Sequence, residues 1–176
     1  RAVTTGSNNT AIGKDALMTN QTGNNNTALG YRTLELSTAH NNTAVGYKAL
    51  LKNTTGSGTA VGYAALSANT TGAWNSAFGS ETLQANSSGS YNHAFGNHAL
   101  LHNTTGDDNV AMGSFSLKSN TSGGSNVAVG NYSLNLNATG DNNTAIGFYA
   151  LGKNTASDGT AVGISALKEN TTGAQN

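Results

Sequence analysis

One short stretch of sequence recurs from near the beginning of the chain to its end. In residues 42–50 it reads Asn-Thr-Ala-Val-Gly-Tyr-Lys-Ala-Leu. Related stretches start 16 or 17 residues apart, so the period varies by a single residue. A period this regular is the sequence signature of a solenoid, in which each copy forms one coil and stacks on its neighbours. The ten copies begin at Asn9, Asn26, Asn42, Gly58, Asn75, Asn92, Asn109, Asn126, Asn143 and Gly159.

The aligned columns, numbered from the first residue of each copy, restrict the shape of a coil. Column three is Ala and column five is Gly in all ten copies, while column four is always larger and apolar. This alternation has the period of two of a β-strand. Column nine is Leu in every copy and predicts a second strand position. Column twelve is Asn in nine copies and column fifteen is Gly in eight, which is typical of turns.

The columns therefore predict an all-β fold, a parallel β-solenoid of about ten coils with 16 or 17 residues each. Residues 1–176 form a single repeat domain, with a partial coil at 1–8 and ten coils at 9–175. Because the chain starts in the middle of a copy, we expect a segment of a longer fibre. Columns four and nine are expected to supply the core: Val45, Leu50, Val61, Leu66, Phe78, Leu83, Phe95, Leu100, Met112 and Leu117.

Two further columns have expected structural roles. The small residues of columns three and five should allow close packing, as at Ala44, Gly46, Ala60 and Gly62. Column twelve should stack its amides from coil to coil as an asparagine ladder of the cross-β kind. Its members include Asn53, Asn69, Asn86, Asn103 and Asn120.

The composition argues against several functional classes. The formal net charge is zero and 9% of residues are charged, so no nucleic-acid-binding surface is expected. No apolar run approaches the ~20 residues of a membrane span, so we expect no direct membrane insertion. There is no Cys, and the acidic residues are scattered without a Gly-x-Ser-x-Gly motif. We predict that the protein is not an enzyme and has no catalytic residues, cofactor or metal site.

A single coil of this length has little interior, which points to association of several chains. Ordering 17 residues costs on the order of 25 kcal/mol, and burial alone balances this only with about 1000 Å² of apolar area. One coil offers an Ala, a Val and a Leu with a few methyl groups. We therefore predict a homotrimer whose chains pack side by side through the small Ala or Gly face.

The repeat resembles two groups of fibrous proteins. Residues 109–113, 126–130 and 143–147 are similar to the Ser/Asn-Val-Ala-Ile-Gly core of the head repeats of YadA-like trimeric autotransporter adhesins. The longer motif at residues 42–56 resembles repeats of phage tail-fibre and bacterial surface-fibre proteins that often end in an intramolecular chaperone domain. The resemblance covers nearly the whole chain. It implies a left-handed β-roll, three chains around one axis, and an extracellular, cell-surface or virion location.

Aromatic side chains are the most suggestive surface feature. Tyr31, Tyr47 and Tyr63 share column six in consecutive copies, while Trp74 and Tyr91 occupy the last column of neighbouring copies. Such rows are able to hold sugars, so a cell-surface glycan or a protein receptor is a candidate partner, and packing between coils or chains is the simpler interpretation. Three histidines, His93, His98 and His102, fall in one copy, but their columns are expected to point in different directions.

The sequence thus predicts a structural shaft or head segment of a fibre that mediates attachment to a host or surface. The alternative is an ice-binding solenoid that uses a Thr-rich face. Column two carries Thr in six copies but breaks in the middle of the rod. The members of that Thr column are Thr10, Thr27, Thr43, Thr59, Thr144 and Thr160.

Overall fold

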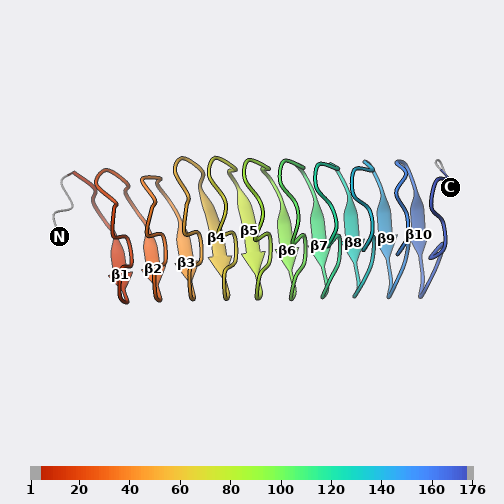
Figure 1. The fold of residues 1–176 in the computed structure, drawn as a ribbon, viewed down its shortest axis with the longest axis horizontal. Helices are drawn as coiled ribbons and strands as arrows, with labels where there is room; N and C mark the ends of the chain where they lie inside the picture. Colours follow the sequence, from red (N-terminus) through yellow and green to blue (C-terminus); the bar gives the residue numbers. More distant parts are fainter. Residues whose placement is uncertain (1–4, 174–176) are drawn as a thin grey trace.

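The chain forms a rod of stacked coils, seen from the side in Figure 1, in a computed structural model that describes residues 5–173. Each coil contributes one short strand, and the strands follow one another in chain order in a single ten-stranded sheet. All neighbouring strands are parallel, so the predicted parallel β-solenoid is confirmed, with nine turns leading from the first strand to the last. No helix in the described part of the chain is long and apolar enough to cross a membrane. The strands are β1 (Thr10–Ile12), β2 (Thr27–Leu29), β3 (Thr43–Val45), β4 (Gly58–Val61), β5 (Asn75–Phe78), β6 (His93–Phe95), β7 (Val110–Met112), β8 (Val127–Val129), β9 (Thr144–Ile146) and β10 (Thr160–Val162).

The register of the sheet places each column directly above itself in the next coil. Between β6 and β7, for example, Ala94 pairs with Ala111 and Phe95 pairs with Met112. Copies of 16 and 17 residues keep this register because the length difference lies outside the strands. A feature of one repeat therefore becomes a row along the whole rod.

The second strand predicted around column nine is not present. Every column-nine Leu has a left-handed backbone, with φ between 47° and 52°, and column seven is left-handed as well. Two left-handed residues separated by one residue turn the chain continuously, which an extended strand cannot do. The turn still bonds to the next coil, as shown by the bond from Leu100 N to Ser116 O (3.0 Å). Each coil is therefore one strand, a glycine bend and a long hydrogen-bonded turn.

The core of the rod is a narrow column of Leu packed against Ala. Leu83 and Leu100 are completely buried, and so are Ala77 and Ala94 on the opposite strands. Small residues of column eight, such as Ala99, complete the interior. The same burial applies to the other column-nine residues expected in the core: Leu50, Leu66 and Leu117.

Column four does not lie in the core of the single chain, contrary to the sequence-based expectation. Val45 and Val61 are half-buried, whereas Phe78, Phe95 and Met112 are 36%, 39% and 44% exposed. The physical reason is the strand alternation, because the inward position belongs to the invariant Ala, and the column-nine Leu fills the space beside it. The large apolar column is therefore on the outside of the rod.

The small residues are required by packing within one chain rather than between chains. Ala44 and Ala60 are completely buried inside the coil, so they are not available to a neighbouring chain as we had expected. Gly46 and Gly62 have φ values of 129° and 144°, which side chains rarely adopt. A Cβ on Gly46 would lie 2.4 Å from the carbonyl oxygen of Gly62 in the next coil. Column five therefore allows the coils to stack.

The column-twelve ladder runs along one side of the interior. Asn103 is completely buried, and its Nδ2 donates to Asn86 Oδ1 (2.9 Å) and to Gly106 O (2.9 Å). Its Oδ1 accepts from Asn120 Nδ2 at 2.8 Å. The same bond joins Asn69 to Asn53 and Asn86 to Asn69, both at 2.8 Å. These amides join successive coils within the interior of the rod.

Column one forms a second asparagine ladder that the sequence analysis did not predict. Asn92 Oδ1 accepts from the backbone N of Asn109 (3.1 Å), and Asn92 Nδ2 donates to Gly106 O (2.8 Å). Where column one is Gly58, the partner changes, and Asn53 Nδ2 instead bonds Asn42 Oδ1 at 3.0 Å. The signal was present in the sequence, because Asn fills column one in eight of the ten copies.

Candidate functional site

The outer surface beside the strands carries a continuous apolar edge. We define this edge as column four together with the aromatic and aliphatic residues of column six, which lie on the two sides of the glycine bend. Ile12, Val162 and Ile164 are 60%, 68% and 80% exposed, so the edge is least covered at the ends of the rod. In the middle, Phe78 and Phe95 stack with ring centroids 4.9 Å apart.

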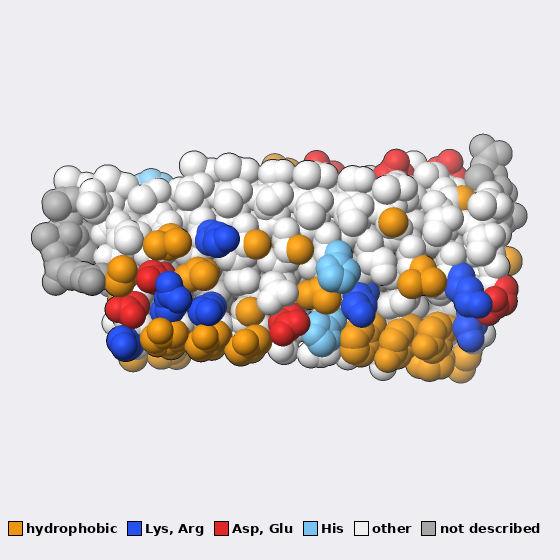
Figure 2. Space-filling model, in the orientation of Figure 1, with side chains coloured by type: hydrophobic (Ala, Val, Ile, Leu, Met, Phe, Trp, Pro, Cys, Tyr) orange, Lys and Arg blue, Asp and Glu red, His pale blue; other side chains and the backbone are white. Residues whose placement is uncertain are grey.

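Three tyrosines of column six form a stacked row. The rings of Tyr31 and Tyr47 lie 5.4 Å apart, and those of Tyr47 and Tyr63 lie 5.1 Å apart and nearly parallel. The coil spacing of about 4.8 Å sets this separation. Lys48 Nζ lies 5.0 Å from the centroid of the Tyr47 ring. In Figure 2, hydrophobic side chains follow the lower edge of the rod at both ends, with acidic and histidine side chains between them.

A second row runs along column seven in the C-terminal half. His98 Nε2 contacts Glu81 Oε2 at 2.9 Å, and the His98 ring lies 5.2 Å from Phe115. Phe115, Tyr132 and Tyr149 then stack at 5.0 and 4.7 Å. All five positions are left-handed in the backbone, so the row is carried by the turn rather than by a strand.

Charged pairs lie near the two ends of the rod. Arg32 Nε donates to Glu35 Oε2, and this hydrogen bond raises the pKa of Arg32. Lys153 Nζ donates to Glu169 Oε2 at 2.7 Å, which lowers the pKa of Glu169. Both effects stabilise the charged forms that the groups already hold at neutral pH. The pairs join side chains on the surface, where water screens them.

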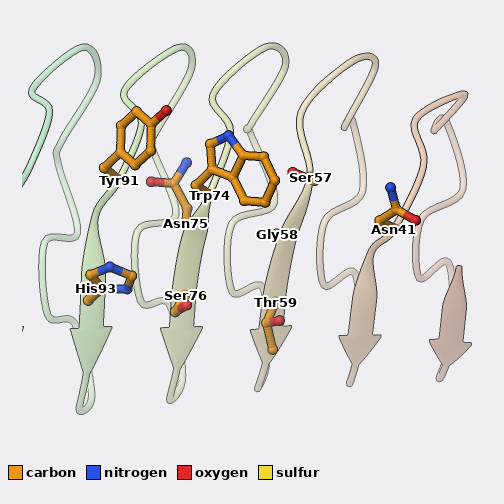
Figure 3. Close-up of a pocket in the computed structure, with 9 residues that line it drawn as sticks. All are labelled: Asn41, Ser57, Gly58, Thr59, Trp74, Asn75, Ser76, Tyr91 and His93. Carbon is orange, nitrogen blue, oxygen red and sulfur yellow. The ribbon is translucent and has the colours of Figure 1, made fainter. Parts of the chain in front are cut away.

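One recess interrupts the regular strand surface, shown in Figure 3. We name it the Trp74 notch, and its volume is about 410 Å³. It lies where the third copy has 16 residues and the following copy begins with Gly instead of Asn. Trp74 and Tyr91 line one side, and Thr59, Ser76 and His93 form a row on the strands below them. Asn41, Ser57, Gly58 and Asn75 complete the lining.

The three neighbouring histidines do not form a cluster. His93 is exposed at the notch, His98 pairs with Glu81, and His102 is exposed on the turn side. Within residues 5–173, no three His, Asp or Glu side chains gather in a way that would hold a metal ion. Nothing in the described surface resembles a nucleophile beside a base.

No protein-family model, curated protein sequence or solved structure matches the chain. A function must therefore be argued from the surface features themselves. These are the apolar edge, the stacked aromatic rows and the Trp74 notch.

The sequence analysis identified Trp74 and Tyr91 but missed the other walls of the notch. Thr59 and Ser76 belong to column two, and Asn41 belongs to the last column of an earlier copy. The available signal was the shortened copy that ends at Ser57, followed by Gly58 in place of Asn. A change of period at this point marks where the regular surface is broken.

Proposed function

We propose that this chain is a non-enzymatic structural segment of an extracellular or virion-borne fibre. In this proposal, three copies associate into a homotrimeric shaft or head that holds an attachment surface away from its base. The observation that carries the proposal is the apolar edge, which runs the length of a rod whose own interior is too narrow to bury it.

The apolar edge has the properties of an association surface. Monomeric soluble proteins rarely expose long contiguous apolar patches, and such patches commonly mark protein interfaces. Met112 and Ile146 are 44% and 42% exposed, and Tyr63 is 52% exposed, so the edge remains uncovered over many coils. Strand register keeps these side chains in straight rows, which lets a second copy match them residue for residue along the rod.

The interior supports a mechanical role. The coils are joined by backbone bonds through both strand and turn, such as Gly113 N to Phe95 O at 2.8 Å. Two buried asparagine ladders run beside the Leu and Ala column. Rows of amides that bond from layer to layer give cross-β structures their stability. The resemblance to adhesin head and tail-fibre repeats supports the same role and an extracellular or virion location.

The first test is the mass of the 176-residue chain in solution, measured by light scattering, with electron microscopy of the same sample. We expect three times 17.7 kDa and short straight rods. The double variant Phe78→Ser and Phe95→Ser removes a stacked pair from the apolar edge and should shift the mass toward the monomer. His102→Ser, on the turn side, is the matched control and should remain trimeric. A wild-type monomer at all concentrations contradicts the proposal.

Ice binding is the second candidate because one observation favours it. Thr10, Thr27, Thr43 and Thr59 are paired in register across four consecutive strands. Regularly spaced hydroxyl and methyl groups on a flat surface are able to order water. The row then passes to Ser76 and His93. Thermal hysteresis of the wild-type protein, lost in Thr43→Tyr, would favour this function over the fibre.

A further inference from the structure

The Trp74 notch combines three departures from the repeat at one place. The preceding copy is one residue shorter, Gly58 removes the column-one side chain, and aromatic residues occupy the last column. In the other copies with a left-handed residue at that column, it is Asn, Asp or Ser. Asn and Asp tolerate left-handed backbone well, whereas bulky side chains seldom adopt it. Trp74 and Tyr91 hold φ values of 61° and 58° there.

Neither aromatic ring is used to stabilise the interior. Trp74 is 61% exposed and Tyr91 is 53% exposed, so most of both side chains faces solvent. Strained backbone carrying an exposed aromatic residue is a feature that points to function rather than to packing. The notch is also at the end of the strand opposite to the glycine bend, and therefore away from the apolar edge that we assign to chain association.

The lining of the notch indicates the chemistry of its ligand. None of its nine lining residues is Asp, Glu, Lys or Arg, so nothing selects a charged group. Two aromatic side chains supply flat apolar surface, while Thr59 and Ser76 supply hydroxyls that both donate and accept hydrogen bonds. Asn41 adds an amide and His93 an imidazole. A flat apolar wall beside a row of neutral polar groups suits a ligand with one apolar face and a rim of hydroxyls.

We propose that the Trp74 notch binds a neutral pyranose unit of a glycan. The C–H face of the sugar would stack on Trp74, with Tyr91 beside it, and its hydroxyls would bond to Thr59, Ser76 and His93. The recess of about 410 Å³ lies within the range of small-molecule sites. This inference deepens the proposed function, on which it rests for its biological role, because it places the attachment chemistry on the rod itself.

The notch contains its own reporter, since Trp74 is the single tryptophan of the chain. We would follow its fluorescence while adding the methyl glycosides of glucose, galactose, mannose and N-acetylglucosamine separately. A monosaccharide of about twelve non-hydrogen atoms on an open site should bind with a Kd on the order of 1 mM. The titrations therefore extend to roughly 50 mM, well above that value.

Two variants make the test specific. Tyr91→Asn installs the residue that Asn142 already supplies at the same column, so folding should be preserved, and we expect at least a tenfold loss of affinity. Tyr63→Ser is the control, because Tyr63 is 52% exposed but lies outside the notch, and Ser80 and Ser114 occupy its column naturally. Its affinity should equal that of the wild type.

Three results would overturn the inference. They are no fluorescence change with any of the four glycosides, an equal change in Tyr91→Asn and wild type, and a blue shift that depends on protein concentration alone. The last would show that a second copy covers the notch. Light scattering on the same samples separates this inference from the fibre proposal. A monomer that binds sugar refutes the trimer only, whereas a trimer without sugar binding refutes the notch only.

Discussion

Replacing Asn103 by aspartate changes one buried atom of the column-twelve ladder while keeping its shape. Asn103 Nδ2 donates to Asn86 Oδ1 and to Gly106 O, both at 2.9 Å. In Asn103→Asp, a carboxylate oxygen faces both acceptors instead. Gly106 O still accepts from Asn92 Nδ2 (2.8 Å), so Asn86 Oδ1 suffers most. The bond accepted from Asn120 Nδ2 (2.8 Å) is kept.

The magnitude follows from these contacts. Two lost hydrogen bonds account for about 2 kcal/mol, and an unpaired buried acceptor beside a buried charge adds about 1–3 kcal/mol. We therefore expect Asn103→Asp to lower the free energy of unfolding by roughly 3–5 kcal/mol at pH 7. The exposed Asn97→Asp is the matched control and should stay within about 0.5 kcal/mol of wild type.

The pH dependence gives an independent check. Burial among oxygen acceptors raises the pKa of the introduced carboxyl in the folded state above its unfolded value of about 3.9. The penalty is therefore complete above the folded pKa and shrinks as the pH falls toward the unfolded one. Urea unfolding followed by circular dichroism at pH 7 and at about pH 4 measures both states. The reasoning is refuted if Asn103→Asp matches Asn97→Asp at pH 7, or if acid does not reduce the difference between them.

Three further predictions concern other parts of the rod. Gly113→Ala should lower the thermal midpoint far more than Gly163→Ala, because both have positive φ but only the former would place a Cβ 2.6 Å from Gly130 C. Equal shifts would mean that φ alone matters. Leu100→Ala, at a completely buried site, should cost about 2–5 kcal/mol in urea unfolding, and a cost below about 1 kcal/mol would contradict our core assignment. Lys153→Met should return the lowered pKa of Glu169 toward its ordinary value by NMR titration, so the contribution of this pair is present above that value and lost as pH falls through the lowered pKa. An unchanged pKa would show that Lys153 is not its cause.

The proposed surfaces differ in how far the sequence revealed them. Tyr31, Tyr47 and Tyr63 could be aligned in one column without a structure, because a fixed period turns a column into a row. The row of Glu81, His98 and Phe115 was harder to recognise, since its chemistry changes from coil to coil. The notch required the structure because its walls come from three coils and one of them is an absent side chain at Gly58.

Some errors had a common physical origin. Columns four and nine were both taken as core because both are invariably apolar, and apolar character alone does not tell which side of the backbone faces inward. Phe95 lies outside and Leu100 inside because the strand alternates about Ala94, whereas the left-handed turn directs the leucine to the interior. Column nine was assigned to a strand because a leucine with positive φ is rare outside tightly determined turns.

The sequence by itself determined the number of repeats, the period, the parallel stacking and the ladder of column twelve. These follow because identical short units must bury similar faces against one another in the same register. Only the tertiary structure decided which apolar column is buried, why column five must be glycine, and how Asn42 and Asn53 link the two ladders. Those features depend on the direction of each side chain and on the distance between coils, which is set when the backbone closes each turn onto the next.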